Sequence, residues 1–474
     1  MVRTLAELAR DTSSGNPEER VAVQYTLNRA GRTPTEHDVV PLRPFTVYTE
    51  RQLDRIEALQ GLPDEQIFAM RVVAHVLPFR VNRYVIDELI DWSNIPDDPV
   101  FQLTFPQPGM LSPEDFQRMA QALGANASRE QIRDVATSIR AGLNPQPDGQ
   151  RLLNIPRMDG ENLEGMQHKY EHTVLFFPSQ GQTCHSYCTF CFRWAQFIGS
   201  KELRFSSSET SKLFSYLRRH SEVTDLLVTG GDPMVMRTNH LKDYLQPLLT
   251  PELAHITSLR IGTKSLTFWP HRYVTDDDAD ELLRLFERLV KAGKHVALMA
   301  HINHWQELDT PMVREAVRRL RSAGVIIRSQ APVLAHINDD AGVWSRLWKT
   351  QVGLGIQPYY MFVERDTGAR RYFQIPLLRA YEIYRDAIRQ VSGLARTARG
   401  PSMSAAPGKV EVQGIAEVAG EKVFVLRFLQ ARNNEWTHRP FFARFDPEAT
   451  WLDQLRPAFG EERFFFQDEH DRMS

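Results

Sequence analysis

The middle of the chain alternates between short apolar runs and longer amphipathic stretches. Apolar runs of this length, bounded by polar or turn residues, are typical of strands buried in a parallel sheet. We predict strands at residues 173–177, 225–230, 259–262, 295–302, 325–330 and 355–363. The amphipathic stretches carry apolar residues at helical spacing. We predict helices at residues 208–220, 277–293, 310–324, 339–351 and 375–391.

Strands that alternate with helices predict parallel pairing through right-handed crossovers. We therefore expect residues 166–400 to have an α/β fold, with the parallel sheet curved into a partial (β/α)6 barrel. In such barrels the chemistry occurs at the carboxyl ends of the strands.

The N-terminal region follows a different pattern. Residues 1–165 are expected to be mainly helical, with helices at 64–79, 112–124 and 128–142. The second of these opens with a Ser-x-x-Asp capping box. Pro and Gly residues between 143 and 166 indicate a domain boundary.

The C-terminal region is predicted to be a small antiparallel β extension. KVEVQGIAEVAGEKVFVLRFLQ (409–430) alternates apolar and polar residues and turns at AGEK. The chain is thus predicted to have three domains, at residues 1–165, 166–400 and 401–474.

Composition adds mainly exclusions. A formal net charge of -2 favours neither a nucleic-acid partner nor a membrane surface. The first twenty residues are too polar for a signal peptide, and no apolar run reaches the length of a membrane span. We therefore expect a cytoplasmic protein.

The three cysteines of the chain are Cys184, Cys188 and Cys191. An odd, clustered set is a poor framework for disulfides, and it offers one ligand fewer than a structural zinc site takes. Three thiolates at C-x3-C-x2-C spacing suit a [4Fe–4S] cluster with one open iron. That iron can chelate the amino and carboxylate groups of S-adenosylmethionine (SAM). The motif follows the first predicted strand, with Phe190 before the third cysteine, and predicts a radical SAM enzyme.

A Gly-Gly-Asp sequence, Gly230 to Asp232, ends the second predicted strand. Two glycines let the backbone approach a ligand closely, here the aminoacyl end of SAM. The same sequence is also found in ordinary turns, but beside the cysteine motif we prefer the ligand-binding interpretation.

Several further segments resemble the lysine 2,3-aminomutase family of radical SAM enzymes, which also bind pyridoxal 5′-phosphate (PLP). The matching segments keep the family's order and approximate spacing. They are HKYEHTVLFF, TGGDP, SLRIGTKSLTFWPHRYVT, AHINH, AGVIIRSQAPVLAHIND, QPYYMFV and APGK.

The resemblance implies roles for individual residues. Lys409 would be the catalytic lysine that binds PLP covalently, and Lys169 would lie near the PLP phosphate. Thr173 stands where the family has a second arginine, so phosphate binding must differ in detail. Arg193 matches the arginine that pairs with the substrate α-carboxylate, as a guanidinium can do with two hydrogen bonds. His301 and Gln330 match positions on the SAM side of the cavity, although both could equally be polar residues at strand ends.

The chain departs from the lysine enzymes where they use two aspartates to hold the substrate's ε-ammonium group. Alignment puts Arg365 at the first of these positions and Ala405 at the second. A cation there reverses the charge demanded of the substrate, which predicts an acidic substrate such as glutamate or aspartate. Glu364 and Asp366 flank Arg365, so a shift of one residue would restore an acid.

The expected activity is therefore a PLP-dependent radical SAM 2,3-aminomutase (an isomerase) that moves an α-amino group to the β-carbon. Its cofactors would be a [4Fe–4S] cluster, SAM and PLP. Two alternatives remain open: another reaction of a PLP-bound amino acid (decarboxylation, epimerisation or elimination), or a regulatory relative without catalytic activity.

The expected partners are a small amino-acid substrate and an electron donor such as flavodoxin or ferredoxin. The family's C-terminal zinc-binding cysteines are missing, which leaves the oligomeric state open, with a homo-oligomer as one option.

Overall fold

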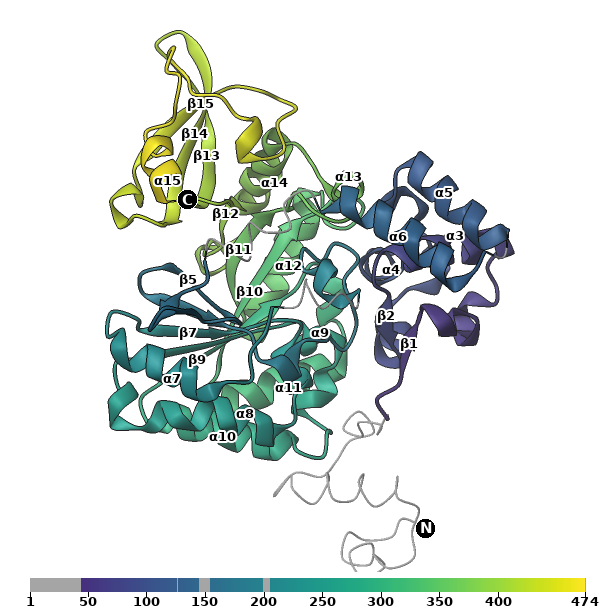
Figure 1. The fold of residues 1–474 in the computed structure, drawn as a ribbon, viewed down its shortest axis with the longest axis horizontal. Helices are drawn as coiled ribbons and strands as arrows, with labels where there is room; N and C mark the ends of the chain where they lie inside the picture. Colours follow the sequence, from purple (N-terminus) through teal and green to yellow (C-terminus); the bar gives the residue numbers. More distant parts are fainter. Residues whose placement is uncertain (1–43, 126, 145–153, 199–204, 474) are drawn as a thin grey trace, which may run out of the picture. The chain divides into compact units, whose positions relative to one another are not determined.

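The computed structural model describes residues 44–125, 127–144, 154–198 and 205–473. The chain divides after Thr46, and the unit that begins at Val47 is built around a sheet. Within the described residues this sheet has 11 strands in the order β15-β14-β13-β12-β11-β10-β9-β8-β7-β6-β5 (Figure 1). Predictions that fall on residues 1–43 and 145–153 lie outside the described residues.

Seven neighbouring strands of the sheet pair in parallel. They are β6 (Thr173–Phe176), β7 (Asp225–Val228), β8 (Ser258–Thr263), β9 (His295–His301), β10 (Ile326–Val333), β11 (Gln357–Val363) and β12 (Arg399–Ser404). The first six overlap the predicted strands, and the mixed α/β class with a mostly parallel sheet is confirmed. The seventh was not predicted, because RGPSMS contains Gly400, Pro401 and several polar residues.

Helices connect these strands and lie along the sheet (Figure 1). They are α7 (Thr210–Arg219), α8 (Thr238–Leu245), α10 (Ala279–Lys291), α11 (Pro311–Ser322), α12 (Ala341–Leu354) and α14 (Leu377–Arg389). Side-chain caps set their starts: the Thr310 hydroxyl accepts from the Val313 amide, and the Asp340 carboxylate accepts from the Val343 amide. Only α8 was missed, since eight residues give too short an amphipathic pattern.

The antiparallel hairpin predicted in the C-terminal region is confirmed. β13 (Gly408–Val418) pairs with β14 (Glu421–Ala431), and β14 pairs with β15 (Pro440–Arg444). The turn falls at Ala419 and Gly420, which both have positive φ, at 52° and 82°. β12 pairs with β13, so the parallel and antiparallel strands form one continuous sheet. The predicted boundary after residue 400 falls inside β12, and the three-domain division stays a prediction.

Helices dominate the described part of the N-terminal region. They are α3 (Asp64–Val76), α4 (Pro99–Thr104), α5 (Pro113–Gly124) and α6 (Arg129–Leu143). Ser112 and Ser128 cap α5 and α6 through their side chains. The apolar faces of α3, α5 and α6 form one core with Phe190 and Trp194, which come from the cysteine segment. The N-terminal helices therefore pack directly against that segment.

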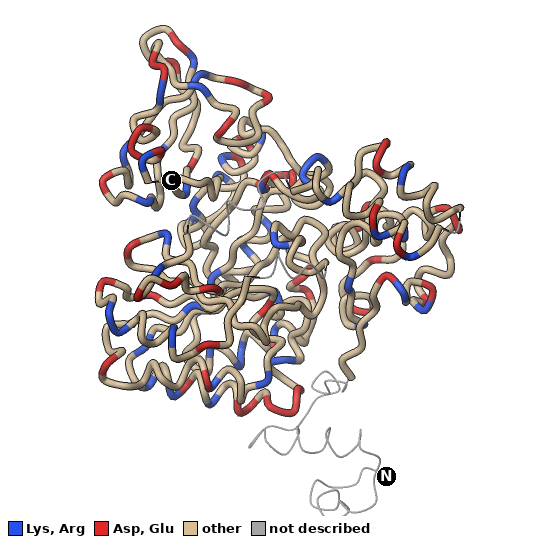
Figure 2. Tube along the Cα trace, viewed as in Figure 1, with Lys and Arg blue, Asp and Glu red and all other residues tan. Residues whose placement is uncertain are grey.

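The remaining strands and helices are short. They are β1 (Val47–Thr49), β2 (Arg80–Asn82), β3 (Arg157–Met158), β4 (Glu161–Asn162), β5 (Met166–Tyr170), α9 (Ser265–Phe268), α13 (Arg370–Phe373) and α15 (Gln467–Met473). Acidic and basic residues are interspersed along the described chain (Figure 2). Among the described residues, no helix has the length and apolarity needed to cross a membrane.

Candidate active site

A cavity of about 310 Å³ lies where the parallel strands end, and the pleat of the strands decides which side chains reach it. In β8, Arg260 and Gly262 line the cavity, whereas the alternate residues Leu259 and Ile261 are buried. β9 and β10 follow the same alternation of two residues. Most of the predicted site residues line this one cavity: Cys184, Cys188, Cys191, Arg193, Gly230, Gly231, Asp232, His301, Gln330, Arg365 and Lys409.

The cysteine segment is held in place by the N-terminal region. The Thr189 amide donates to the carbonyl oxygen of Leu103, and the Tyr187 amide donates to that of Arg80. Buried Asn82 donates to the Ser186 hydroxyl from both its backbone amide and its side chain, each at 2.9 Å. Much of the described N-terminal region thus acts as a support for the segment that carries the cysteines, a role that the sequence alone did not reveal.

The three thiols have an environment that suits an iron–sulfur cluster. Burial raises the pKa of each cysteine, that of Cys191 to about 11, so the thiolate forms need a strongly cationic partner. Within the described residues, no three His, Cys, Asp or Glu side chains converge on a single metal ion. In a cubane each thiolate binds a different iron, so the sulfurs lie farther apart than around one zinc ion. The residues present therefore fit the [4Fe–4S] group.

The glycines of the Gly-Gly-Asp loop are required by contact with the cysteine segment. Gly230 has φ of +149°, and a Cβ on Gly231 would lie 2.5 Å from the backbone nitrogen of Thr183. The Asp232 amide donates to the carbonyl oxygens of Gly181 and Thr183. The loop thus lines the cavity and also locks the start of the cysteine segment.

Asp232 joins this loop to the end of β8. Its carboxylate accepts hydrogen bonds from the Thr263 hydroxyl at 2.6 Å and from the backbone amides of Met234, Lys264 and Ser265. Burial raises the pKa of Asp232 to about 6, although these four donors oppose the shift. The predicted SAM-binding aspartate is therefore also a structural node.

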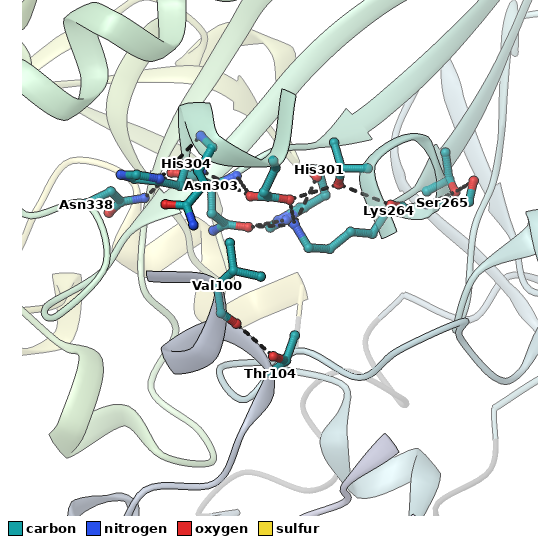
Figure 3. Close-up of polar contacts among 12 residues, drawn as sticks. Val100, Thr104, Lys264, Ser265, His301, Asn303, His304 and Asn338 are labelled. Atoms are coloured by element: carbon teal, nitrogen blue, oxygen red, sulfur yellow. Dashed lines mark hydrogen bonds and ion pairs between the residues drawn. The ribbon is translucent and has the colours of Figure 1, made fainter. Parts of the chain in front are cut away.

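Lys264 and Glu307 form a buried ion pair beside the cavity (Figure 3), with 2.6 Å between Lys264 Nζ and Glu307 Oε2. The same ammonium group donates to the His301 carbonyl oxygen and to Asn303 Oδ1. His301 stacks on Phe190, and burial lowers the pKa of its imidazole to about 3. The imidazole of His301 is consequently neutral and lines the cavity next to the cysteine segment.

Lys409 lies on β13, with its amine directed into the cavity from the antiparallel side of the sheet. Its Nζ donates to Gln430 Oε1 at 2.9 Å and lies 4.6 Å from the centre of the Tyr360 ring. Burial, assisted by the charges of Arg260 and Arg399, lowers the pKa of Lys409 to about 7. A large fraction of this amine is therefore neutral near neutral pH, as a nucleophilic lysine requires.

Two arginines reach the cavity from the segments after β6 and β11. The guanidinium group of Arg193 lies 4.3 Å from the Phe177 ring, and that of Arg365 lies 4.9 Å from the Phe192 ring. Arg365 Nε is buried and has no hydrogen-bond partner among the described residues. Burial lowers the pKa of Arg193 to about 10 and also lowers that of Arg365, yet a guanidinium remains charged at neutral pH.

Lys169 is the one predicted site residue that does not line the cavity. Its Nζ donates to the Ala405 carbonyl oxygen at 2.5 Å. Burial and the nearby charges of Arg432, Arg365 and Lys409 lower its pKa well below the usual range. Lys169 therefore belongs to a group of cations behind the cavity wall.

Other cavity residues escaped the sequence analysis. Arg260, Lys264, Tyr360 and Glu364 all line the cavity. A signal was available for the first two, because Arg260 and Lys264 interrupt an apolar strand at even spacing. Glu364 had been considered only as an alternative to Arg365, whereas both side chains line the cavity.

Comparison with known proteins agrees with this geometry. No family model matches the chain. An Aquifex aeolicus protein with the name "Putative L-lysine 2,3-aminomutase" is 29% identical over 407 residues, which cover 86% of this chain and 95% of that protein. The L-lysine 2,3-aminomutase of Escherichia coli is 28% identical, over 78% of this chain and 91% of its own length. Over most of its length this chain is similar to lysine 2,3-aminomutases, which are radical SAM enzymes.

A further member of the aminomutase family has another substrate in its name. The glutamate 2,3-aminomutase of Clostridioides difficile is 28% identical over 291 residues, which cover 56% of this chain and 66% of that protein. Among solved structures, a radical SAM methyltransferase from Sphaerobacter thermophilus gives a TM-score of 0.37 at 13% identity, over 59% of this chain and 91% of that one. The chain is homologous to radical SAM aminomutases, which are enzymes, and this similarity implies a [4Fe–4S] cluster and SAM.

Removing one cluster ligand should abolish the first chemical event. We expect Cys188→Ala to lose the iron–sulfur cluster and all formation of 5′-deoxyadenosine, because the chain has no other thiol to replace the ligand. Iron content and anaerobic SAM cleavage with dithionite measure both effects. A variant that retains the cluster and cleaves SAM at the native rate would contradict the assignment.

Adding a methyl group at Gly231 should disturb the cysteine segment. In Gly231→Ala the new Cβ would overlap the Thr183 backbone, which we expect to cost about 1–3 kcal/mol of folding stability and to weaken cluster binding. Gly353→Ala in α12 is the matched control, since its Cβ would meet nothing within 4 Å. Denaturant unfolding measures both variants. Equal stability of the two would show that the Gly231 contact is not tight.

Proposed function

We propose that this chain is a PLP-dependent radical SAM aminomutase that moves the amino group of an acidic amino acid from its α- to its β-carbon. The observation that carries the proposal is the partly buried Arg365 side chain, which lines the same cavity as the cysteines and Lys409 and whose Nε has no hydrogen-bond partner among the described residues. The parallel strands and their connecting helices are further inferred to form a partial (β/α)6 barrel.

The residues around Lys409 suit PLP. A buried amine with a pKa lowered to about 7 can bond to an aldehyde near neutral pH. Arg432 lies close to Lys169 and supplies positive charge, as an anionic phosphate needs. When bound, PLP supplies a carbonyl carbon that bonds to the migrating nitrogen and a conjugated ring that spreads an unpaired electron, while the cluster and SAM supply the radical.

Arg193 and Arg365 would orient the substrate at its two ends. Arg193 would bind the α-carboxylate, and Arg365 would bind the side-chain carboxylate. Both arginines are partly buried, so each interaction with a carboxylate is stronger than it would be in water. Two fixed ends hold the carbon atoms between them in one position, which favours a single site of hydrogen abstraction.

Lys409 would hold or release a proton at Nζ. Its pKa near 7 lets it accept a proton when the cofactor leaves it and return that proton later. The apolar residues Phe190, Met299 and Phe362 line the cavity and limit the access of water to the reacting atoms.

The charge of Glu364 bears on the choice between acidic and basic substrates. Burial raises the pKa of its carboxyl well above the usual range, despite the opposing charge of Arg365. A protonated Glu364 offers no negative charge to a substrate ammonium group. Arg365 stays charged, so the pair favours a carboxylate, which agrees with the substrate predicted from sequence.

Two kinds of partner belong to the same proposal. A one-electron donor such as flavodoxin or ferredoxin would reduce the cluster, and assembly into a homo-oligomer would be compatible with the family. Decarboxylation, epimerisation and elimination would use the same cofactors as amino migration. Analysis of the products would distinguish these reactions.

Capture of PLP should follow the titration of Lys409. Neutral amine increases as the pH rises through the lowered pKa, so borohydride-trapped pyridoxyl at Lys409 should reach half its maximum near pH 7. Peptide mapping across pH 5.5–9 measures this, with Lys291→Met as the control because Lys291 is exposed. Labelling of a different lysine, or a midpoint above pH 9, would contradict the role of Lys409.

Replacing Arg365 and replacing Glu364 should have very different effects on the binding of glutamate. Arg365→Gln should weaken glutamate binding by roughly 30-fold or more, since a buried carboxylate then loses its ionic partner, at a cost of about 2–5 kcal/mol. Glu364→Gln is the matched control, since glutamine has the size and the neutral charge of the protonated Glu364 side chain, and it should change binding less than about threefold. Binding is measured calorimetrically on the anaerobic, PLP-loaded protein.

The reverse pattern would overturn the substrate assignment. If Glu364→Gln destroyed binding of lysine while Arg365→Gln left it intact, Glu364 would be the residue that recognises the substrate. If neither variant changed the affinity for glutamate or lysine, neither Arg365 nor Glu364 would recognise the substrate. The assignments of the cysteines and Lys409 would not be affected.

A further inference from the structure

A second cavity, of about 1040 Å³, lies at the opposite ends of the same parallel strands. We call it the basal cavity, because residues at or near the amino ends of the strands line it. Asp225 begins β7, Ser258 begins β8 and His295 begins β9, and all three line it. The two cavities lie along the same face of the sheet. In β10, where every second residue lies on that face, Arg328 lines the basal cavity, and Gln330 and Pro332 line the active-site cavity.

The lining of the basal cavity is strongly basic. Arg260, Arg321, Arg328 and Arg399 contribute four guanidinium groups, and Asp225 contributes the one carboxylate among the lining residues. Arg260 is already neutralised, because its Nε donates to Asp225 Oδ1 at 2.9 Å and its Nη2 donates to Oδ2 of the same side chain. Three positive charges therefore remain in excess.

Arg328 and Arg399 flank an aromatic ring. Their guanidinium carbons lie 5.1 and 4.4 Å from the centre of the Tyr359 ring, and Arg399 also lies 4.3 Å from that of Tyr360. Neither arginine forms an ion pair with a carboxylate in the described part of the chain. Both are partly buried at the cavity wall, where an uncompensated charge is costly.

We propose that the basal cavity binds a small phosphate-bearing molecule, with a phosphate group held between Arg328 and Arg399. A phosphate oxygen pair matches the planar fork of a guanidinium group, and a di- or polyanion balances the charge excess that a single carboxylate would leave. The volume lies just above the range of about 300–1,000 Å³ that is typical of small-molecule sites. The proposal does not depend on the aminomutase reaction.

The basal site adjoins Lys409. Gln430 lines the basal cavity and accepts the hydrogen bond of the Lys409 amine. Arg399 is one of the charges that disfavour protonation of that amine. An anion bound to Arg399 screens this charge, so occupancy of the basal cavity shifts the balance between neutral and protonated Lys409 toward the protonated form.

Inorganic pyrophosphate is the probe for the test. Calorimetry on the full-length protein should show one site per chain, and Arg328→Gln and Arg399→Gln should each weaken binding at least tenfold. Arg439→Gln is the matched control, because Arg439 also stacks on a ring, at 4.1 Å from Phe465, but lies outside the cavity. Its binding should equal that of the native protein.

A second measurement does not need variants. Phenylglyoxal modifies accessible arginines, and pyrophosphate should protect Arg328 and Arg399 in the native protein but leave Arg439 reactive, as peptide mapping would show. Protein saturated with PLP should bind pyrophosphate as tightly as PLP-free protein. Absence of binding at millimolar pyrophosphate, equal weakening in Arg439→Gln, or loss of binding after PLP loading would each overturn the proposal, the last by assigning the phosphate contacts to PLP.

Discussion

The candidate active site depends on the hydrogen bonds of one buried residue, Asp232. Its amide fixes the start of the cysteine segment through Gly181 and Thr183, and its oxygens hold Thr263 and two further amides after β8. Through its backbone amide and its side chain, this one residue thus joins the segments at the ends of three neighbouring strands. Because these strands carry the cysteines, the glycine loop and Lys264, the relative positions of the predicted cluster and SAM sites follow from this one residue.

Uncompensated positive charge is the second organising feature. Arg193 and Arg365 line a largely apolar cavity, where isolated cations are costly and anions bind strongly. Where the fold does neutralise a buried cation, as in the Lys264–Glu307 and Arg260–Asp225 pairs, the residue has a structural role. The cations without such a partner are the ones that suit carboxylate and phosphate groups.

Sequence patterns predicted much of this structure. Hydrophobic periodicity identified six of the parallel strands, since buried strands have a strong local signal. The cysteine spacing predicted a cluster-binding segment, and the structure places its three cysteines on one cavity. β12 and α8 were missed because a Gly-Pro strand and a two-turn helix lack that signal. Pattern alone could not reveal that Arg328 and Arg399 face one cavity, since single arginines in a sequence resemble solvated surface residues. Likewise, Glu364 and Arg365 are adjacent in sequence, and only the structure shows that both line the cavity.

The central claim is that the cavity converts an acidic α-amino acid into its β-isomer. The most direct measurement is mass spectrometry of products from the anaerobic enzyme with reduced cluster, SAM, PLP and ¹⁵N-labelled glutamate. The account predicts 3-aminopentanedioic acid that retains the label, and no turnover of lysine. Recovery of unchanged glutamate alongside efficient conversion of lysine to its β-isomer would contradict it.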